Sequence, residues 1–185
     1  MNKMVFFLKR LYTFFTHPST LFYYKNFKGT IFHSGTILKG TKYMHINHSI
    51  FARKCSIKTF NLNKKNKECL IYINNSYFGD NAYISSSGGL FIDNASFAPN
   101  VFIGSYKHSL TDLDIDSNYK ITIDKPKFIG QNVSIFGNVE IGENSVIGAC
   151  SVVTKNVSPN TMVVGNPAKI IKIYNVDLHE WTKAD

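Results

Sequence analysis

The fold is decided by residues 123–158, which read IDKPKF IGQNVS IFGNVE IGENSV IGACSV VTKNVS when the stretch is divided into sixes. Every group opens with isoleucine or valine, and its fifth place is mostly small or β-branched. An α-helix turns about every 3.6 residues, so a column with a period of six would drift around its surface. In a strand, side chains alternate in direction, and positions four apart face the same side. The period therefore predicts strands. The aliphatic column consists of Ile123, Ile129, Ile135, Ile141, Ile147 and Val153.

Three such edges close a triangular coil of about 18 residues, and successive coils stack about 4.8 Å apart. The aliphatic column then forms an apolar ladder inside a prism. A glycine after the aliphatic residue, as at Gly130, Gly142 and Gly148, suits a corner where the chain bends or takes a positive φ. Weaker copies of the pattern occur upstream, with a slip of two residues between Ile84 and Ile92. We expect six or seven coils between about residues 30 and 158.

Composition and charge indicate the class of protein, its location and the kind of partner it binds. The chain has 185 residues, 44% of them hydrophobic, which fits one globular domain. Three cysteines without a CxxC pair argue against a disulfide framework and for a reducing, cytoplasmic location. The formal net charge of +9 suggests an anionic partner, which could be nucleic acid, a membrane surface or a phosphorylated small molecule. No recognised nucleic-acid motif accompanies the charge, so we expect no nucleic acid partner.

Two terminal segments flank the predicted coil domain of residues 30–172. Residues 1–29 are rich in aromatic and basic residues and predict an amphipathic helix, which either caps the open end of the prism or rests on a membrane surface. We favour the cap. Residues 173–185 predict a short helix, because Asp177 and Glu180 have the spacing of a capping box.

The hexad disappears over about residues 104–120, which predicts an extended loop leaving the solenoid. Long excursions of this kind often carry function. The loop holds His108, whose side chain type exchanges protons near neutral pH. A histidine in a loop is most often structural or solvated, but its place at the foot of this loop favours a catalytic base. Asp112 and Asp114 follow it and are candidates for orienting the imidazole or the substrate.

Two strings of residues resemble the hexapeptide-repeat acyltransferases, in the branch of sugar, serine and xenobiotic O-acetyltransferases. They are IGENSVIGACSVVTKNV at residues 141–157 and GNPAKIIK at residues 165–172, within a resemblance that covers about residues 72–172. The resemblance implies an all-β, left-handed parallel β-helix and a homotrimer with active sites between subunits. It also implies transfer of acetyl from acetyl-CoA to a hydroxyl, without a metal.

The same resemblance assigns roles to individual residues. His108 would take the proton from the acceptor hydroxyl, which is worth roughly 10²–10⁴-fold in rate. Phe128 stands where the family usually has tryptophan, and Ser86 where some sugar acetyltransferases have an acidic residue. Tyr106, Asp112 and Asp114 join Ser86 as candidates for acceptor binding. Acetyl-CoA would lie against Phe128, Gly130, Gly148, Ala149, Thr154, Lys155, Lys169 and Lys172.

Three other interpretations stay open at this point. A metal-dependent carbonic anhydrase shares this type of fold but needs three converging histidines, and His108 has no close partner in sequence. A solenoid can also build structure or present a binding surface without catalysis. Within the family, the acceptor could be an antibiotic, although we favour a sugar or a precursor of a polysaccharide or lipopolysaccharide.

Overall fold

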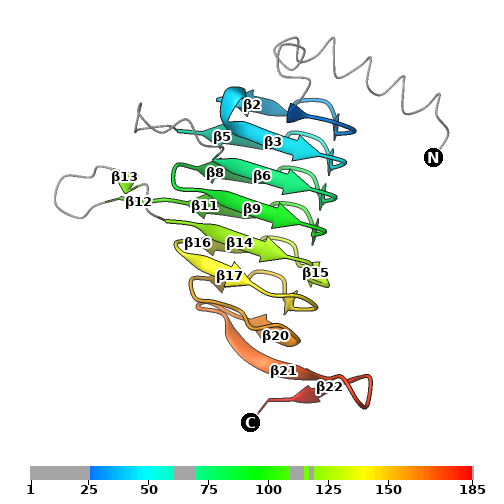
Figure 1. The fold of residues 1–185 in the computed structure, drawn as a ribbon. Helices are drawn as coiled ribbons and strands as arrows, with labels where there is room; N and C mark the ends of the chain where they lie inside the picture. Colours follow the sequence, from blue (N-terminus) through cyan, green and yellow to red (C-terminus); the bar gives the residue numbers. More distant parts are fainter. Residues whose placement is uncertain (1–25, 61–69, 109–114, 117–118, 185) are drawn as a thin grey trace.

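The computed structural model describes residues 26–60, 70–108, 115–116 and 119–184. Over these residues the chain winds as a three-sided prism whose faces are sheets of stacked, mainly parallel strands (Figure 1). One 3₁₀ turn, η2 (Thr41–Tyr43), interrupts the strands in the described part. The predicted parallel coil is therefore confirmed. Of the predicted N-terminal segment, residues 1–25 lie outside the described residues.

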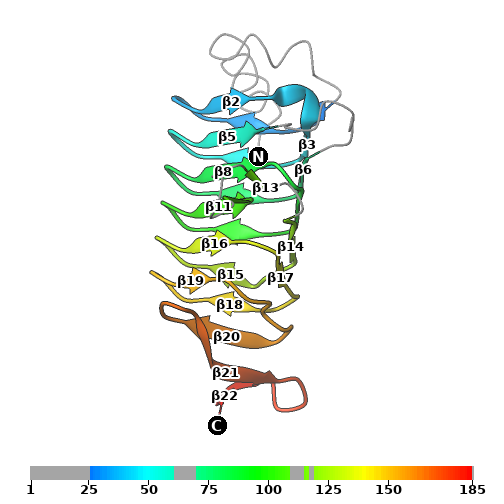
Figure 2. The same cartoon turned by 90° about the vertical axis from the view of Figure 1, so that its left-hand side faces the viewer.

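Each face of the prism collects one strand from every coil. Sheet B consists of β2 (Ile37–Lys39), β5 (Ser56–Thr59), β8 (Tyr83–Ser86), β11 (Phe102–Ser105), β16 (Ser134–Phe136) and β19 (Val152–Val153), and its strands appear as successive layers in Figure 2. Sheet C consists of β3 (Met44–Asn47), β6 (Ile71–Asn74), β9 (Leu90–Asp93), β14 (Ile121–Asp124) and β17 (Val139–Ile141).

Sheet A continues furthest along the prism. Its parallel strands are β1 (Ile31–Phe32), β4 (Ile50–Phe51), β7 (Tyr77–Phe78), β10 (Ser96–Phe97), β15 (Phe128–Ile129), β18 (Val146–Ile147) and β20 (Thr161–Val164). Two antiparallel strands complete it, β21 (Lys169–Asn175) and β22 (Glu180–Lys183). We name the three turns between faces the AB, BC and CA corners, in the order in which the chain meets them.

The aliphatic column fills the interior as predicted. Its six residues, from Ile123 to Val153, are at most 1% exposed. They pair in register across coils, so that Ile123 faces Ile141 and Ile135 faces Val153. The upper coils are longer than the lower ones, since Ile73 pairs with Ile92, 19 residues on, whereas Ile123 pairs with Ile141, 18 residues on. The slip seen in the sequence is a longer corner in the upper coils and not a break in the coil.

Aromatic rings replace aliphatic residues in the upper half of sheet A. Phe51, Phe78 and Phe97 are fully buried, and their rings stack with centroids 4.6 and 4.4 Å apart. Phe97 then pairs with Ile129, where the column becomes aliphatic. The core is therefore one continuous column that changes its residue type halfway along the prism.

The corner glycines act by close approach and do not take the positive φ that was one of their two predicted uses. A Cβ atom on Gly130 would lie 2.6 Å from the backbone nitrogen of Ala149 in the next coil. The positive φ values fall instead on residues such as Asn132 (57°) and Asn144 (55°). Asparagine tolerates this conformation better than most residues do. Its amide also bonds the next coil, as from Asn144 to Asn160 at 2.7 Å.

The C-terminal segment corrects the prediction of a short helix, because β21 and β22 form an antiparallel hairpin. The Asn175 side chain accepts hydrogen bonds from the backbone nitrogens of Asp177 and Leu178, both at 3.0 Å, and so organises the turn between the strands. The run KIIKIY at residues 169–174 favours a strand because β-branched and aromatic residues fit a pleated surface. The spacing that predicted a capping box belongs to this turn.

Candidate active site

His108 lies on a small ladder of two strands that projects from the prism (Figure 1). The chain leaves sheet B after β11 and forms β12 (Lys107–His108), which pairs antiparallel with β13 (Ile115–Asp116) before the coil resumes at β14. The predicted excursion is therefore present, and the His108 side chain is exposed on it. Its ring meets the Tyr106 ring edge to face, with centroids 5.9 Å apart and planes at 85°. Asp112 and Asp114 lie outside the described residues.

Ser86 is fully buried where β8 ends, close to the start of the loop. Its hydroxyl donates to the carbonyl of Leu70 at 2.9 Å and accepts from the Ser105 hydroxyl at 2.8 Å and from the backbone nitrogen of Gly89 at 3.2 Å. These bonds join neighbouring coils beneath the root of the loop. The acceptor-binding role of Ser86 stays a prediction.

Four of the residues predicted to bind acetyl-CoA meet at the AB corner. Phe128 on β15 is 45% exposed and is followed directly by Ile129 and Gly130. The nearest atoms to a Cβ on Gly130 belong to Gly148 and Ala149, one coil further on. Ala149 is exposed. The corner thus presents the Phe128 ring beside the exposed Ala149.

The predicted lysines divide between two places. Lys169 pairs with Val164 at the end of β20, and the preceding Ala168 bonds the carbonyl of Val152, so Lys169 lies just beyond the AB corner. Lys172 follows on β21 opposite Met162. Lys155 and Thr154 instead follow β19 at the BC corner, on the opposite edge of sheet B. All four predicted phosphate-binding residues, Thr154, Lys155, Lys169 and Lys172, are exposed.

Within one copy of the chain, His108 and the AB corner lie at opposite ends of sheet B. Gly130 precedes β16, whose last residue, Phe136, pairs with Gly104, and His108 is a further four residues along the departing chain. At about 3.3 Å per residue, the width of the sheet alone is on the order of 15 Å. One copy therefore does not place the imidazole against the predicted thioester site.

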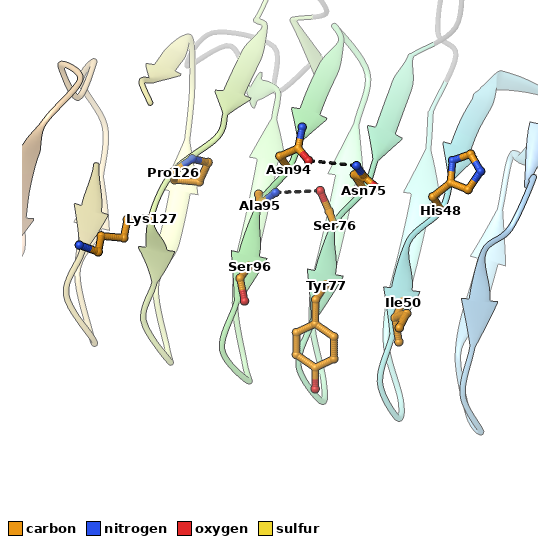
Figure 3. Close-up of a pocket in the computed structure, with 10 residues that line it drawn as sticks. All are labelled: His48, Ile50, Asn75, Ser76, Tyr77, Asn94, Ala95, Ser96, Pro126 and Lys127. Atoms are coloured by element: carbon orange, nitrogen blue, oxygen red, sulfur yellow. Dashed lines mark hydrogen bonds between the residues drawn. The ribbon is translucent and has the colours of Figure 1, made fainter. Parts of the chain in front are cut away.

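A shallow hollow of about 350 Å³ lies elsewhere, at the CA corner and the adjoining part of sheet A (Figure 3). None of the predicted site residues lines it, and its amides are already used, as from Asn75 to Asn94 at 3.0 Å. Lys127 lies at the edge of the hollow toward the C-terminal coils. The equivalent positions in the neighbouring coils hold buried Ala95 and Ser145. The sequence carried this signal, since Lys127 is the charged exception in the small fifth-position column.

In the part of the chain that the structure describes, no three His, Cys, Asp or Glu side chains converge in a way that could hold a metal ion. Among the same residues, no helix combines the length and the apolar character needed to span a bilayer.

Sequence relatives point to one class of enzyme. The chain is 38% identical over 96 residues to the galactoside O-acetyltransferase of Escherichia coli K12, which covers 49% of this chain and 47% of that protein. It is 32% identical over 129 residues to a protein of the same strain provisionally named as the lipopolysaccharide biosynthesis O-acetyl transferase WbbJ, covering 62% of this chain and 66% of that protein. The chain spans from about one third to just under two thirds of the length of the curated relatives that it matches. No family model matches the chain.

A solved structure supports the architecture. A mutant of AntD, an N-acyltransferase from Bacillus cereus, superposes with a TM-score of 0.62 at 19% identity, over 82% of this chain and 84% of that chain. The hexad coil with a projecting loop defines a hexapeptide-repeat protein. With the relatives named above, this chain is similar to the hexapeptide-repeat acyltransferases, in the branch that contains sugar O-acetyltransferases.

Proposed function

We propose that the protein transfers acetyl from acetyl-CoA to a hydroxyl of a sugar or glycan precursor, with His108 as the general base. The observation that carries the proposal is the exposed imidazole of His108, presented on a ladder where the chain leaves the regular coil. A purely structural solenoid has no need of this arrangement. A left-handed sense of the coil, from the family resemblance, is part of the proposal, as is a cytoplasmic location.

In the proposed reaction, His108 acts as the base and the AB corner holds the donor. The imidazole takes the proton from the acceptor hydroxyl as that oxygen attacks the thioester carbonyl carbon. The carbon–sulfur bond then breaks, the acetyl group becomes an ester, and the thiolate of CoA takes up a proton. No covalent intermediate on the protein is involved. The backbone of the exposed Ala149 would pair with the amides of the pantetheine arm, next to Gly148 and beside the Phe128 ring, while Lys169 and Lys172 would face the phosphates as point charges.

The separation described above supports an assembly of several copies. Because His108 and the AB corner lie at opposite ends of sheet B, a complete site needs His108 from one copy and the AB corner from its neighbour. We therefore propose a homotrimer with an active site in each cleft between subunits. This assembly would also cover part of the apolar side chains that the hairpin exposes, including Ile170, Ile173 and Leu178, which are about half exposed or more.

The acceptor class rests on the relatives. One is named for a galactoside and another for lipopolysaccharide biosynthesis. The AntD structure holds a nucleotide sugar, dTDP-4-amino-4,6-dideoxyglucose, together with Coenzyme A. These names favour a glycan over an antibiotic as the acceptor. The net charge of +9 also suits a donor and an acceptor that carry phosphates.

The test measures free thiol released from acetyl-CoA in the presence of galactosides, nucleotide sugars, an amino sugar and aminoglycoside or phenicol drugs. We expect release with a sugar hydroxyl acceptor, and a drop in kcat of about 10²–10⁴-fold for His108→Ala. His45→Ala serves as the matched control, because His45 is an exposed histidine on β3 in sheet C. Thiol release that is absent with every acceptor, or that His108→Ala leaves unchanged, would rule the proposal out.

A further inference from the structure

We propose that Tyr106 is a positioning residue that fixes the orientation of the His108 imidazole through an edge-to-face ring contact. The inference rests on the proposed function, and it gives Tyr106 a role different from the acceptor contact predicted from the sequence. The two rings lie 5.9 Å apart at 85°, which is a preferred geometry for aromatic pairs. Because Tyr106 is two residues before His108 on an extended chain, both side chains leave the same side of that chain.

The Tyr106 ring is held by the prism and not by the loop. It is half-buried, whereas the His108 side chain is exposed. Burial raises the pKa of the Tyr106 phenol, the neighbouring Tyr83 phenol adds to this rise, and the Ser85 hydroxyl opposes it. Both of these neighbours lie on β8, the strand beside β11 in sheet B, and Tyr106 directly follows β11. The Tyr106 side chain therefore packs back onto sheet B while its backbone begins the loop.

Gly104 provides the space for this packing. A Cβ atom there would lie 2.9 Å from Cε1 of Phe102 and 3.3 Å from Cε1 of Tyr106, so the two rings share the volume that a side chain would fill. Its φ is not in the left-handed region, so close approach and not backbone freedom explains glycine at this position. The Phe102 ring is itself stacked on Tyr83 at 5.1 Å. Tyr106 thus joins an aromatic cluster on the outer face of sheet B, formed by Tyr83, Phe102 and Tyr106.

The cluster explains how a histidine on a two-residue strand can act as a precise base. Only some rotamers of an imidazole point a ring nitrogen at the acceptor. The Tyr106 ring, packed against the His108 ring, restricts these rotamers before substrate binds. Since the contact acts on the orientation of the base, its loss should lower kcat more than it raises KM.

The first test compares three variants in the full chain. Tyr106→Leu removes the ring and should lower kcat by about 10- to 100-fold with KM little changed. Tyr106→Phe keeps the ring and should stay within about threefold of the parent. Tyr72→Leu is the matched control, because Tyr72 also belongs to an outward aromatic stack, with Phe91 at 5.0 Å, on a different sheet. A Tyr106→Phe variant as impaired as Tyr106→Leu, or a rise in KM at constant kcat, would overturn the inference and make Tyr106 a substrate contact.

The second test does not depend on activity. The imidazole carbon-bound protons of His108, followed by NMR, should carry a ring-current shift that Tyr106→Leu abolishes and Tyr106→Phe retains. Gly104→Ala should alter the same resonances, because the new methyl group displaces the two rings. This second variant provides the test if Tyr106→Leu fails to fold. Unchanged His108 resonances in both variants would refute the positioning role. If the parent shows the shift but no thiol release, the contact stands and the proposed function alone fails.

Discussion

The most demanding test of the fold concerns Phe78, in the middle of the buried aromatic stack. Its side chain is 0% exposed, and its ring lies 4.6 Å from Phe51 above and 4.4 Å from Phe97 below, nearly parallel to both. The same three residues pair in register in sheet A. A substitution here therefore weakens two interfaces between coils at once.

The size of the effect follows from burial. Phe→Ala in a closed core removes the transfer free energy of the ring and leaves a cavity, together about 3–5 kcal/mol. The coils on either side cannot collapse into the gap, because the strand spacing of the sheet fixes their separation. For a chain of this length each kcal/mol shifts the melting temperature by about 2–4 °C, so Phe78→Ala should lower it by about 6–20 °C.

The matched control is Phe91→Ala on β9. Phe91 stacks on Tyr72 at 5.0 Å, much as Phe78 stacks on its neighbours, but it is 40% exposed on the outer face of sheet C. Its loss should cost about 1 kcal/mol or less. Calorimetry gives the two shifts, and amide hydrogen exchange should show faster opening confined to the coils around β7, since a solenoid loses stability through nearest-neighbour interfaces. Equal losses for the two variants would refute the reasoning, because ring stacking and not burial would then dominate.

Three further predictions concern the glycines at the AB corner and the buried Cys55 thiol. Gly130→Ala should lower the free energy of unfolding by about 1–3 kcal/mol, because its Cβ would meet the backbone of Ala149. Gly148→Ala should lower the free energy of unfolding by less, because the nearest atom there is a methyl group of Val164 that can turn away. Urea titration of both variants measures the difference. Burial raises the pKa of the Cys55 thiol from 9.0 to about 11, so iodoacetamide at pH 8 should label the exposed Cys150 in the native chain and Cys55 only after unfolding, as mapped by mass spectrometry. Between pH 9 and 11 the unfolded Cys55 thiol ionises before the folded one, so the free energy of unfolding should fall as pH rises, and a Cys55→Ala chain should lack this part of the slope.

The hexad was sufficient to predict the prism because its period carries three-dimensional information. Residues 18 apart in the lower coils occupy equivalent positions in adjacent coils, so the spacing of Ile123 and Ile141 predicts that they are neighbours. The upper coils were harder to interpret, since their corners are longer and phenylalanine replaces isoleucine inside. The paired register of Phe78 with Phe97 shows that the same rule holds there with 19 residues per coil.

The C-terminal hairpin shows where local sequence rules compete. Asp177 and Glu180 have a spacing that a helix cap and a turn can share, and the outcome depended on what the preceding strand pairs with. Because β20 leaves an open edge at the end of sheet A, Lys169–Asn175 adds to that edge as β21. An edge strand that finds a partner is more stable than an exposed one, and nothing in residues 173–185 alone states that the edge is there.

The sequence predicted two parts of the candidate site, the AB corner and His108, but could not relate them in space because the repeat covers only the first. Gly130 and Gly148 differ by one coil length, so the repeat itself places them together at the AB corner, and the structure brings them into contact. His108 lies in the excursion, where the period is lost, so no sequence spacing relates it to any corner. The structure resolves its immediate surroundings, at Tyr106 and Gly104, and shows that the two halves lie at opposite ends of sheet B within one copy. A repeat can therefore predict the surface that would hold the donor, whereas the base that acts on the acceptor depends on a loop and on the neighbouring copy that the loop would reach.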